Sequence, residues 1–143
     1  MNPVSVLFAL HGAIILFSGL VGGLFFARAI KRASGEVAWR VVHAGGCAGG
    51  ALLLAISVPL QWVSLSSLLT LVLIWSFLLG TYLLVSGMFV AAIWNTRGIP
   101  GGGNVLNRLV NGLYGAGAVL SLTGSALLIV GLLNAYCCAP ASA

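Results

Sequence analysis

Charged side chains are missing from long parts of this sequence, and their absence constrains the fold more than any other feature. No Asp, Glu, Lys or Arg lies before Arg28, between Arg40 and Arg97, or after Arg108. Only 5% of the residues are charged, and 61% are hydrophobic. A soluble domain carries about 25% charged residues. The chain is therefore predicted to be a small integral membrane protein. A soluble domain, a disordered tail and a nucleic-acid-binding protein are excluded, despite the net charge of +5.

Four apolar stretches are long enough to cross a bilayer. A hydrocarbon core of about 30 Å needs roughly 20 apolar residues per helix. We place the helices at about residues 4–27, 39–58, 65–94 and 105–134 of a single domain that spans residues 1–143. No stretch alternates polar and apolar residues, which excludes a membrane β-barrel. The predicted fold class is an all-α integral membrane bundle of four transmembrane helices.

The basic residues predict how the chain is oriented. All six flank the first or the third connection between the apolar stretches. They are Arg28, Lys31, Arg32 and Arg40 around the first, and Arg97 and Arg108 around the third. These two connections share one side of an up-and-down bundle, and the positive-inside rule assigns that side to the cytoplasm. We expect a multi-pass protein of the cell inner membrane, with both termini facing outward and a lipid bilayer around the helices.

Glycines recur at four-residue spacing along the predicted helices. The pairs are Gly19 and Gly23 in the first helix, and Gly45 and Gly49 and then Gly46 and Gly50 in the second. Lipid removes the hydrophobic drive between helices, so small residues allow the close approach that replaces it. Two interpretations stay open. The glycines pack helices within or between copies of the chain, or those of the second helix leave a flat trough for a planar ligand.

Two histidines are the candidates for chemistry, because ionisable groups inside a membrane are costly. His43 follows Arg40 by one helical turn, and the third connection adds Arg97, Asn104 and Arg108. An imidazole with nearby guanidinium groups suits haem, as the imidazole binds iron and the arginines pair with propionates. The alternative is an interfacial His43 bonded to a backbone carbonyl.

His11 lies at a different depth from His43, which argues against two imidazoles on one haem. We expect His11 to form a hydrogen bond across helices, with Gly12 allowing the contact. Polar residues at membrane depth supply further pocket candidates. These are Tyr82 on the third helix and Asn111 and Tyr114 on the fourth, where Asn107 shares their face. The glycine-rich connection from Arg97 to Asn104 is interpreted as a tight turn that brings both residues near His43. Cys137 and Cys138 are interpreted as an exposed tail.

The order of three motifs resembles the styrene oxide isomerases, a family of small four-helix membrane proteins. The first motif is the pair His11-Gly12 in the first helix. The second is the run Trp39, His43 and Gly45 that opens the second helix. The third is the turn between helices three and four, formed by Arg97, Gly98, Ile99, Gly102 and Asn104. The resemblance spans most of the chain.

This resemblance implies a homotrimer with haem b between protomers and His43 as the iron ligand. It implies that ferric iron acts as a Lewis acid on a small hydrophobic epoxide, which rearranges to a carbonyl compound without net electron transfer. Arg40, Arg97, Asn104 and Arg108 would then hold the cofactor. Tyr82, Asn111 and Tyr114 would serve the substrate pocket.

The sequence also departs from the family pattern. The family pocket has an Asn on the second helix and an Asp, an Asn and a Tyr on the third. An ungapped alignment puts Gly49, Gly80, Leu84 and Met88 at those positions. A non-enzymatic membrane scaffold or a haem-binding accessory protein is therefore the alternative function. Microsomal glutathione transferases fit less well, because the predicted second helix carries neither the Asn nor the Glu of their glutathione site. Small cationic-drug exporters fit less well, because they depend on a membrane-embedded Glu and Glu36 is expected in a loop.

Overall fold

Long helices form nearly all of the structure, a computed structural model that describes residues 2–99 and 103–138. The helices are α1 (Pro3–Arg32), α2 (Glu36–Ser57), α3 (Ser67–Trp94) and α4 (Val105–Cys138). A short 3₁₀ helix, η1 (Pro59–Trp62), lies between α2 and α3. All four α-helices are long and apolar enough to cross a membrane. The predicted four-helix membrane architecture is thus confirmed, and the chain is a multi-pass membrane protein.

The helix ends show why the helices begin and end where they do. At the start of α1 the Asn2 side chain accepts a hydrogen bond from the Val4 N–H, and at the start of α3 the Ser66 hydroxyl accepts one from Leu69. Such side-chain acceptors satisfy N–H groups that have no partner inside the helix. The end of α1 is marked by Ala33, whose φ of 49° is left-handed. The helix thus ends at Arg32 and not at residue 27, where the uncharged stretch ends. Its last turns carry Arg28, Lys31 and Arg32.

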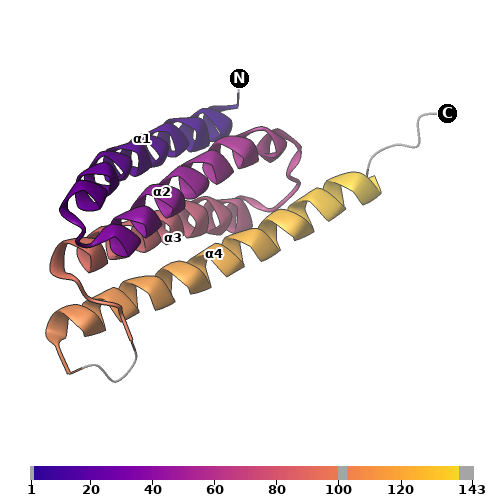
Figure 1. Ribbon diagram of the computed structural model, residues 1–143. Coiled ribbons are helices and arrows are strands. Elements are labelled where there is room, and N and C mark those ends of the chain that lie inside the picture. Colours follow the sequence, from indigo (N-terminus) through magenta and orange to yellow (C-terminus); the bar gives the residue numbers. More distant parts are fainter. Residues whose placement is uncertain (1, 100–102, 139–143) are drawn as a thin grey trace.

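The four helices are arranged as two pairs (Figure 1). The first pair is α1 with α2, the second is α3 with α4, and α2 against α3 joins the pairs. Within the described residues α4 contacts neither α1 nor α2, because α3 lies between α4 and that pair (Figure 1). The core lies where α1, α2 and α3 meet, around Phe8, Leu53 and Leu73, which are fully buried.

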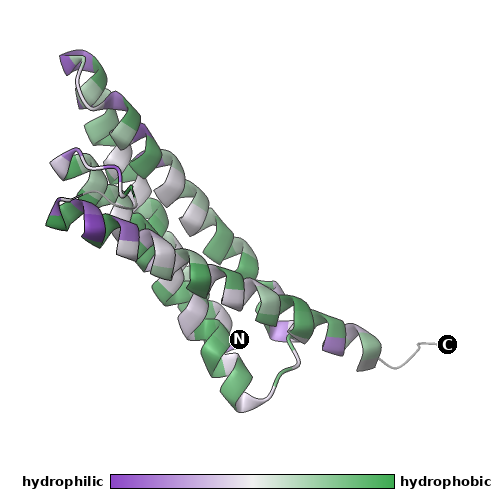
Figure 2. Ribbon diagram, turned by 90° about the horizontal axis from the view of Figure 1, so that it is seen from below, coloured by the Kyte–Doolittle hydropathy of each residue, from purple (hydrophilic) through white to green (hydrophobic). Residues whose placement is uncertain are grey.

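Both basic connections lie at the same end of the molecule. The turn between α1 and α2 and the connection from α3 to α4 are at one end, while η1 and the start of α1 are at the other (Figure 1). Hydrophilic residues concentrate at the first of these ends (Figure 2). We call it the basic end, since it carries all six Lys and Arg residues. Residues 100–102 of the expected tight turn, including Gly102 of the third motif, lie outside the described residues.

Glycine allows the backbones of α1 and α2 to touch. A Cβ atom added to Gly46 would lie 2.6 Å from the Gly19 Cα, and one added to Gly50 would lie 2.7 Å from the Gly12 carbonyl oxygen. Neither backbone can move without separating the helices. Gly45 and Gly49 face Met88 and Thr81 of α3 instead. The four glycines of α2 thus pack against α1 and α3, and they leave no open trough within the chain.

Gly19→Ala tests this close approach. The added methyl group would meet the backbone of Gly46 and Cys47, so we expect the free energy of unfolding to fall by about 1–3 kcal/mol, as overpacked cores do. The measurement is reversible unfolding in detergent micelles, followed by circular dichroism.

Gly115→Ala is the matched control for this experiment. Nothing lies within 4 Å of a Cβ atom added at Gly115, and alanine is the better helix former. Its stability should equal or exceed that of the wild type. Equal stability of the two variants would show that backbone contact between α1 and α2 does not limit the fold.

Candidate functional site

His43 lies on α2, about two turns from the start of that helix, and its ring leans toward α1. Its Nδ1 atom is 2.9 Å from the carbonyl oxygen of Gly19. A carbonyl oxygen only accepts hydrogen bonds, so Nδ1 must carry the proton and donate it. In the neutral ring this leaves the lone pair on Nε2. The predicted alternative, an imidazole bonded to a backbone carbonyl, describes this contact correctly and is compatible with a ligand role for Nε2.

The hydrogen bond of His43 is of the kind that orients a metal-binding histidine. Metal-binding histidines usually donate their second ring N–H to a carbonyl or a carboxylate, as His43 does to Gly19. Arg40 lies one turn nearer the basic end, about 60° around the helix from His43, and it is exposed. Haem iron needs only one or two side-chain ligands. The described residues contain no group of three His, Cys, Asp or Glu side chains that could hold a bare metal ion.

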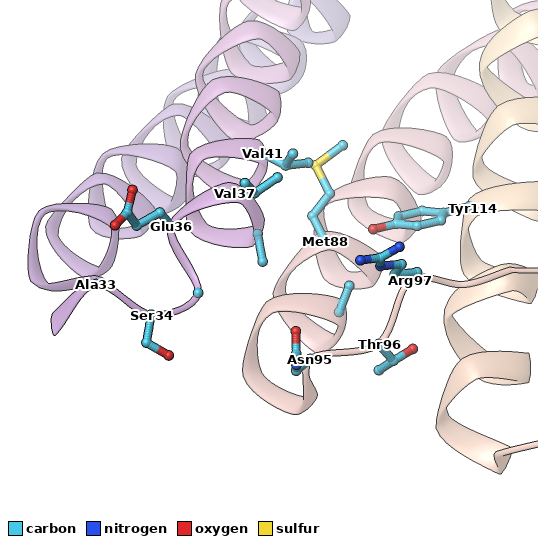
Figure 3. A pocket seen from close by; sticks show the side chains of 13 residues that line it. Ala33, Ser34, Glu36, Val37, Val41, Met88, Asn95, Thr96, Arg97 and Tyr114 are labelled. Carbon is cyan, nitrogen blue, oxygen red and sulfur yellow. The ribbon is translucent and has the colours of Figure 1, made fainter. Parts of the chain in front are cut away.

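A cavity of about 660 Å³ opens at the basic end, between α2 and α3. Val37, Val41 and Met88 form its apolar wall, and Figure 3 shows Arg97 and Tyr114 close together on one side, with Glu36 on the opposite side. The remaining lining residues are Ala33, Ser34, Gly35, Ala38, Ala91, Asn95 and Thr96. The cavity therefore combines apolar walls with a guanidinium and a phenol.

His43 and this cavity lie on opposite faces of α2. Val41 lines the cavity and Gly45 faces Met88, and each is two residues from His43. Two residues correspond to about 200° around an α-helix. The structure thus puts Arg97 and Tyr114 on the far side of α2 from the imidazole. The expectation that the third connection brings Arg97 near His43 does not hold within one chain.

The other predicted residues of the third connection lie at its surface. Asn104 is exposed, and its side-chain oxygen accepts a hydrogen bond from the Leu106 N–H at the start of α4. Arg108 and Asn111 are exposed on the first turns of α4. No described contact brings any of these three side chains to His43. Their available partners are water, lipid headgroups or a second copy of the chain.

Asn107 is a residue whose role the sequence did not reveal. Its side-chain oxygen accepts from the Ile99 N–H at 3.0 Å, and its amide nitrogen donates to the Ile99 carbonyl at 2.6 Å. The Thr96 hydroxyl also donates to it. Asn107 therefore holds the chain that follows α3 against α4 and fixes the position from which Arg97 enters the cavity. The signal available in the sequence was an amide side chain two residues after the start of a helix that follows a glycine-rich connection.

His11 forms the predicted hydrogen bond across helices. Its Nδ1 atom is 2.9 Å from the Tyr82 hydroxyl of α3, and the two rings meet edge to face. Gly12, the next residue, is buried against Gly50 and Leu54 of α2. The pair therefore connects α1 to α3 directly, and it occupies the Tyr82 hydroxyl, which the sequence suggested for a substrate pocket.

The fold and the site together define the class of protein to which the chain belongs. The chain is a small multi-pass membrane protein with one imidazole on its second helix whose Nδ1–H is held by a backbone carbonyl. The family model described as styrene oxide isomerase matches residues 4–133. The chain therefore belongs to the styrene oxide isomerase family, as the motifs predicted. No curated protein matches the chain by sequence.

A double-mutant cycle on His11→Ala and Tyr82→Phe measures the contact between α1 and α3. Hydrogen bonds between membrane helices couple by about 0.6 kcal/mol on average and up to about 1.7 kcal/mol. We expect a coupling in that range, measured from the unfolding of the wild type, both single variants and the double variant in detergent. Additive effects of the two changes would mean that the hydrogen bond contributes nothing to stability.

Proposed function

We propose that this protein is a haem b-dependent isomerase that converts a small hydrophobic epoxide into a carbonyl compound. Membership of the styrene oxide isomerase family supports the reaction class. The observation that carries the proposal is the hydrogen bond from His43 Nδ1 to the Gly19 carbonyl, because it leaves Nε2 free to bind iron. We place the protein in the cell inner membrane, with the basic end in the cytoplasm.

The proposed reaction is an isomerisation that conserves atoms and electrons. One carbon–oxygen bond of the epoxide breaks, a hydrogen or carbon group moves with its electron pair to the adjacent carbon, and a carbonyl group forms. A bound ferric haem would supply a Lewis-acidic iron that draws electron density from the epoxide oxygen. His43 would hold that group, and Arg40 would pair with a propionate. Val41 and Met88 lie at the other face of α2, so these apolar walls would exclude water from a haem held by a neighbouring copy and suppress hydrolysis to a diol there.

A trimer would bring His43 of one copy close to Arg97 and Tyr114 of another, although these residues lie on opposite sides of α2 within one chain. His43 and the cavity lie about 200° apart around α2, so the two surfaces face different neighbours. Two different surfaces that bind each other form head-to-tail contacts, which close into a ring when the rotation permits. We propose a homotrimer in which the cavity of one copy faces His43 of the next. Arg97 and Tyr114 would then reach the haem held by the neighbouring copy.

The remaining candidates have roles consistent with this arrangement. Asn104 and Arg108 are exposed at the basic end, where they would contact a propionate or the adjacent copy. Asn111 lies on the exposed face of α4, one turn from Tyr114, and would contribute to the substrate pocket only in the assembly. Tyr82 would act indirectly, because its hydroxyl is hydrogen-bonded to His11.

A haem-binding accessory protein without isomerase activity is the second candidate. The positions that carry the family's polar pocket residues hold Gly49, Gly80, Leu84 and Met88 here. All four pack: Gly49 against Thr81, Gly80 and Leu84 against Gly117 of α4, and Met88 against Gly45. These positions offer no hydrogen-bond donor to an epoxide oxygen, so binding of haem and isomerisation need separate tests.

His43→Ala tests the cofactor, with His11→Ala as the matched control. Each change removes one imidazole of the two in the chain. We expect the purified wild type to show a Soret band near one haem per chain, His43→Ala to lose it, and His11→Ala to keep it. Ultraviolet-visible spectra in mild detergent give the result, with size-exclusion profiles showing that each variant is folded.

The same preparations separate the two candidate functions. Conversion of styrene oxide to phenylacetaldehyde by the wild type, lost with the haem in His43→Ala, supports the isomerase. Bound haem with no conversion of this or other aryl and alkyl epoxides supports the accessory protein. A colourless wild type, after expression with added haem precursor, would rule out both.

Complementation tests the head-to-tail trimer. We pair His43→Ala with Ala91→Trp, a change that fills the cavity. Neither variant alone should bind haem. Co-expression of both should restore about a quarter of the wild-type haem, since each mixed ring of three keeps one intact interface. No recovery in mixed oligomers, isolated through two different affinity tags, would contradict this arrangement.

A further inference from the structure

Gly23 differs from the other glycines of α1 in what it faces. At Gly19 and Gly12 an added Cβ atom would come within 3.0 Å of backbone atoms of α2. At Gly23 the three nearest atoms all belong to the His43 ring, at 2.8 Å for Nδ1, 3.1 Å for Cε1 and 3.4 Å for Cγ. The approach of the two helices therefore requires glycine at 19 and 12. At position 23 glycine is required only because a side chain there would collide with the His43 ring.

Three groups surround the Nδ1 edge of the ring. The Gly19 carbonyl accepts its hydrogen bond at 2.9 Å, the Cα of Gly23 lies beside it with no side chain between, and the Cys47 sulfur is 3.6 Å away. Two of the three come from α1, one turn apart. The same helix thus supplies both the acceptor for the Nδ1 proton and the space that the ring needs to reach that acceptor.

We propose that Gly23 is a positioning residue for His43. Its missing side chain lets the Nδ1 edge of the imidazole approach α1, where the Gly19 carbonyl fixes the Nδ1-protonated form and directs Nε2 away from α1. The relevance to haem rests on the function proposed above, whereas the effect on the ring does not. Outer partners of a metal-binding histidine raise the basicity of the ligand and fix its orientation. Cys47 has a lesser part, because a thiol is a weak hydrogen-bond partner.

The first test uses the protein without haem and reads the tautomer directly. In a His11→Gln background His43 is the sole histidine, so its two ring ¹⁵N shifts report which nitrogen carries the proton. We expect the Nδ1-protonated form in the Gly23 protein. In Gly23→Ala the ring must turn away from the Gly19 carbonyl, and the signal should move to the Nε2-protonated form that free histidine favours.

Gly115→Ala is again the matched control, since it adds the same methyl group to a helical glycine with open space beside it. It should leave both ¹⁵N shifts unchanged. Gly23→Ala should also keep the wild-type circular dichroism spectrum, because the atom that must yield belongs to a side chain and not to a backbone. An unfolded Gly23→Ala protein would show that Gly23 serves helix packing, and would overturn the proposal.

The second test uses the haem-loaded protein. The rate of haem transfer to excess apomyoglobin should rise about 10- to 100-fold in Gly23→Ala, the loss typical when outer partners of a metal ligand are disturbed. Cys47→Ala should change the rate in the same direction by less. An unchanged rate and unchanged ¹⁵N shifts in Gly23→Ala would overturn the proposal. If the wild type binds no haem, the function proposed above fails, and the tautomer measurement still decides the role of Gly23.

Discussion

Backbone contact between α1 and α2 is the constraint on which the rest of the structure depends. Lipid offers the helices no hydrophobic reason to associate, so the close approach at Gly19 and Gly46 must supply the packing. That approach also brings a backbone carbonyl of α1 within reach of an imidazole on α2. Packing and chemistry therefore share one contact. A larger residue at Gly19 would push the two helices apart and so move its own carbonyl, the acceptor that sets the tautomer of His43, away from the ring.

The architecture could be predicted from the sequence because it follows from the placement of charge. Charge-free stretches mark the membrane spans, and six basic residues mark the end at which the first and third connections meet. The sequence predicted that His11 forms a hydrogen bond across helices, since a histidine in a membrane needs a partner, but it did not identify Tyr82 as that partner. The partner depends on the packing of α1 against α3, which the sequence does not specify.

The position of Arg97 relative to His43 could not be predicted in the same way. Soluble helices reveal their inner face by a polar side opposite an apolar side, but α3 and the part of α2 beyond His43 show no such division. The rotation of each helix about its axis is set instead by which glycines meet a backbone. The sequence analysis assigned Gly19 and Gly23 the same role in helix packing, because the two glycines are four residues apart. Only their neighbours, a backbone for one and an imidazole for the other, distinguish them.

The short turn between α1 and α2 has a consequence for how the protein is made. Only Ala33, Ser34 and Gly35 separate the two helices, and the three groups described at the Nδ1 edge of His43 all belong to α1 or α2. The groups that orient the imidazole are thus all present once the hairpin of α1 and α2 has entered the bilayer, before α3 and α4 are synthesised. In the order of synthesis, the ring is oriented before the cavity on the other face of α2 exists.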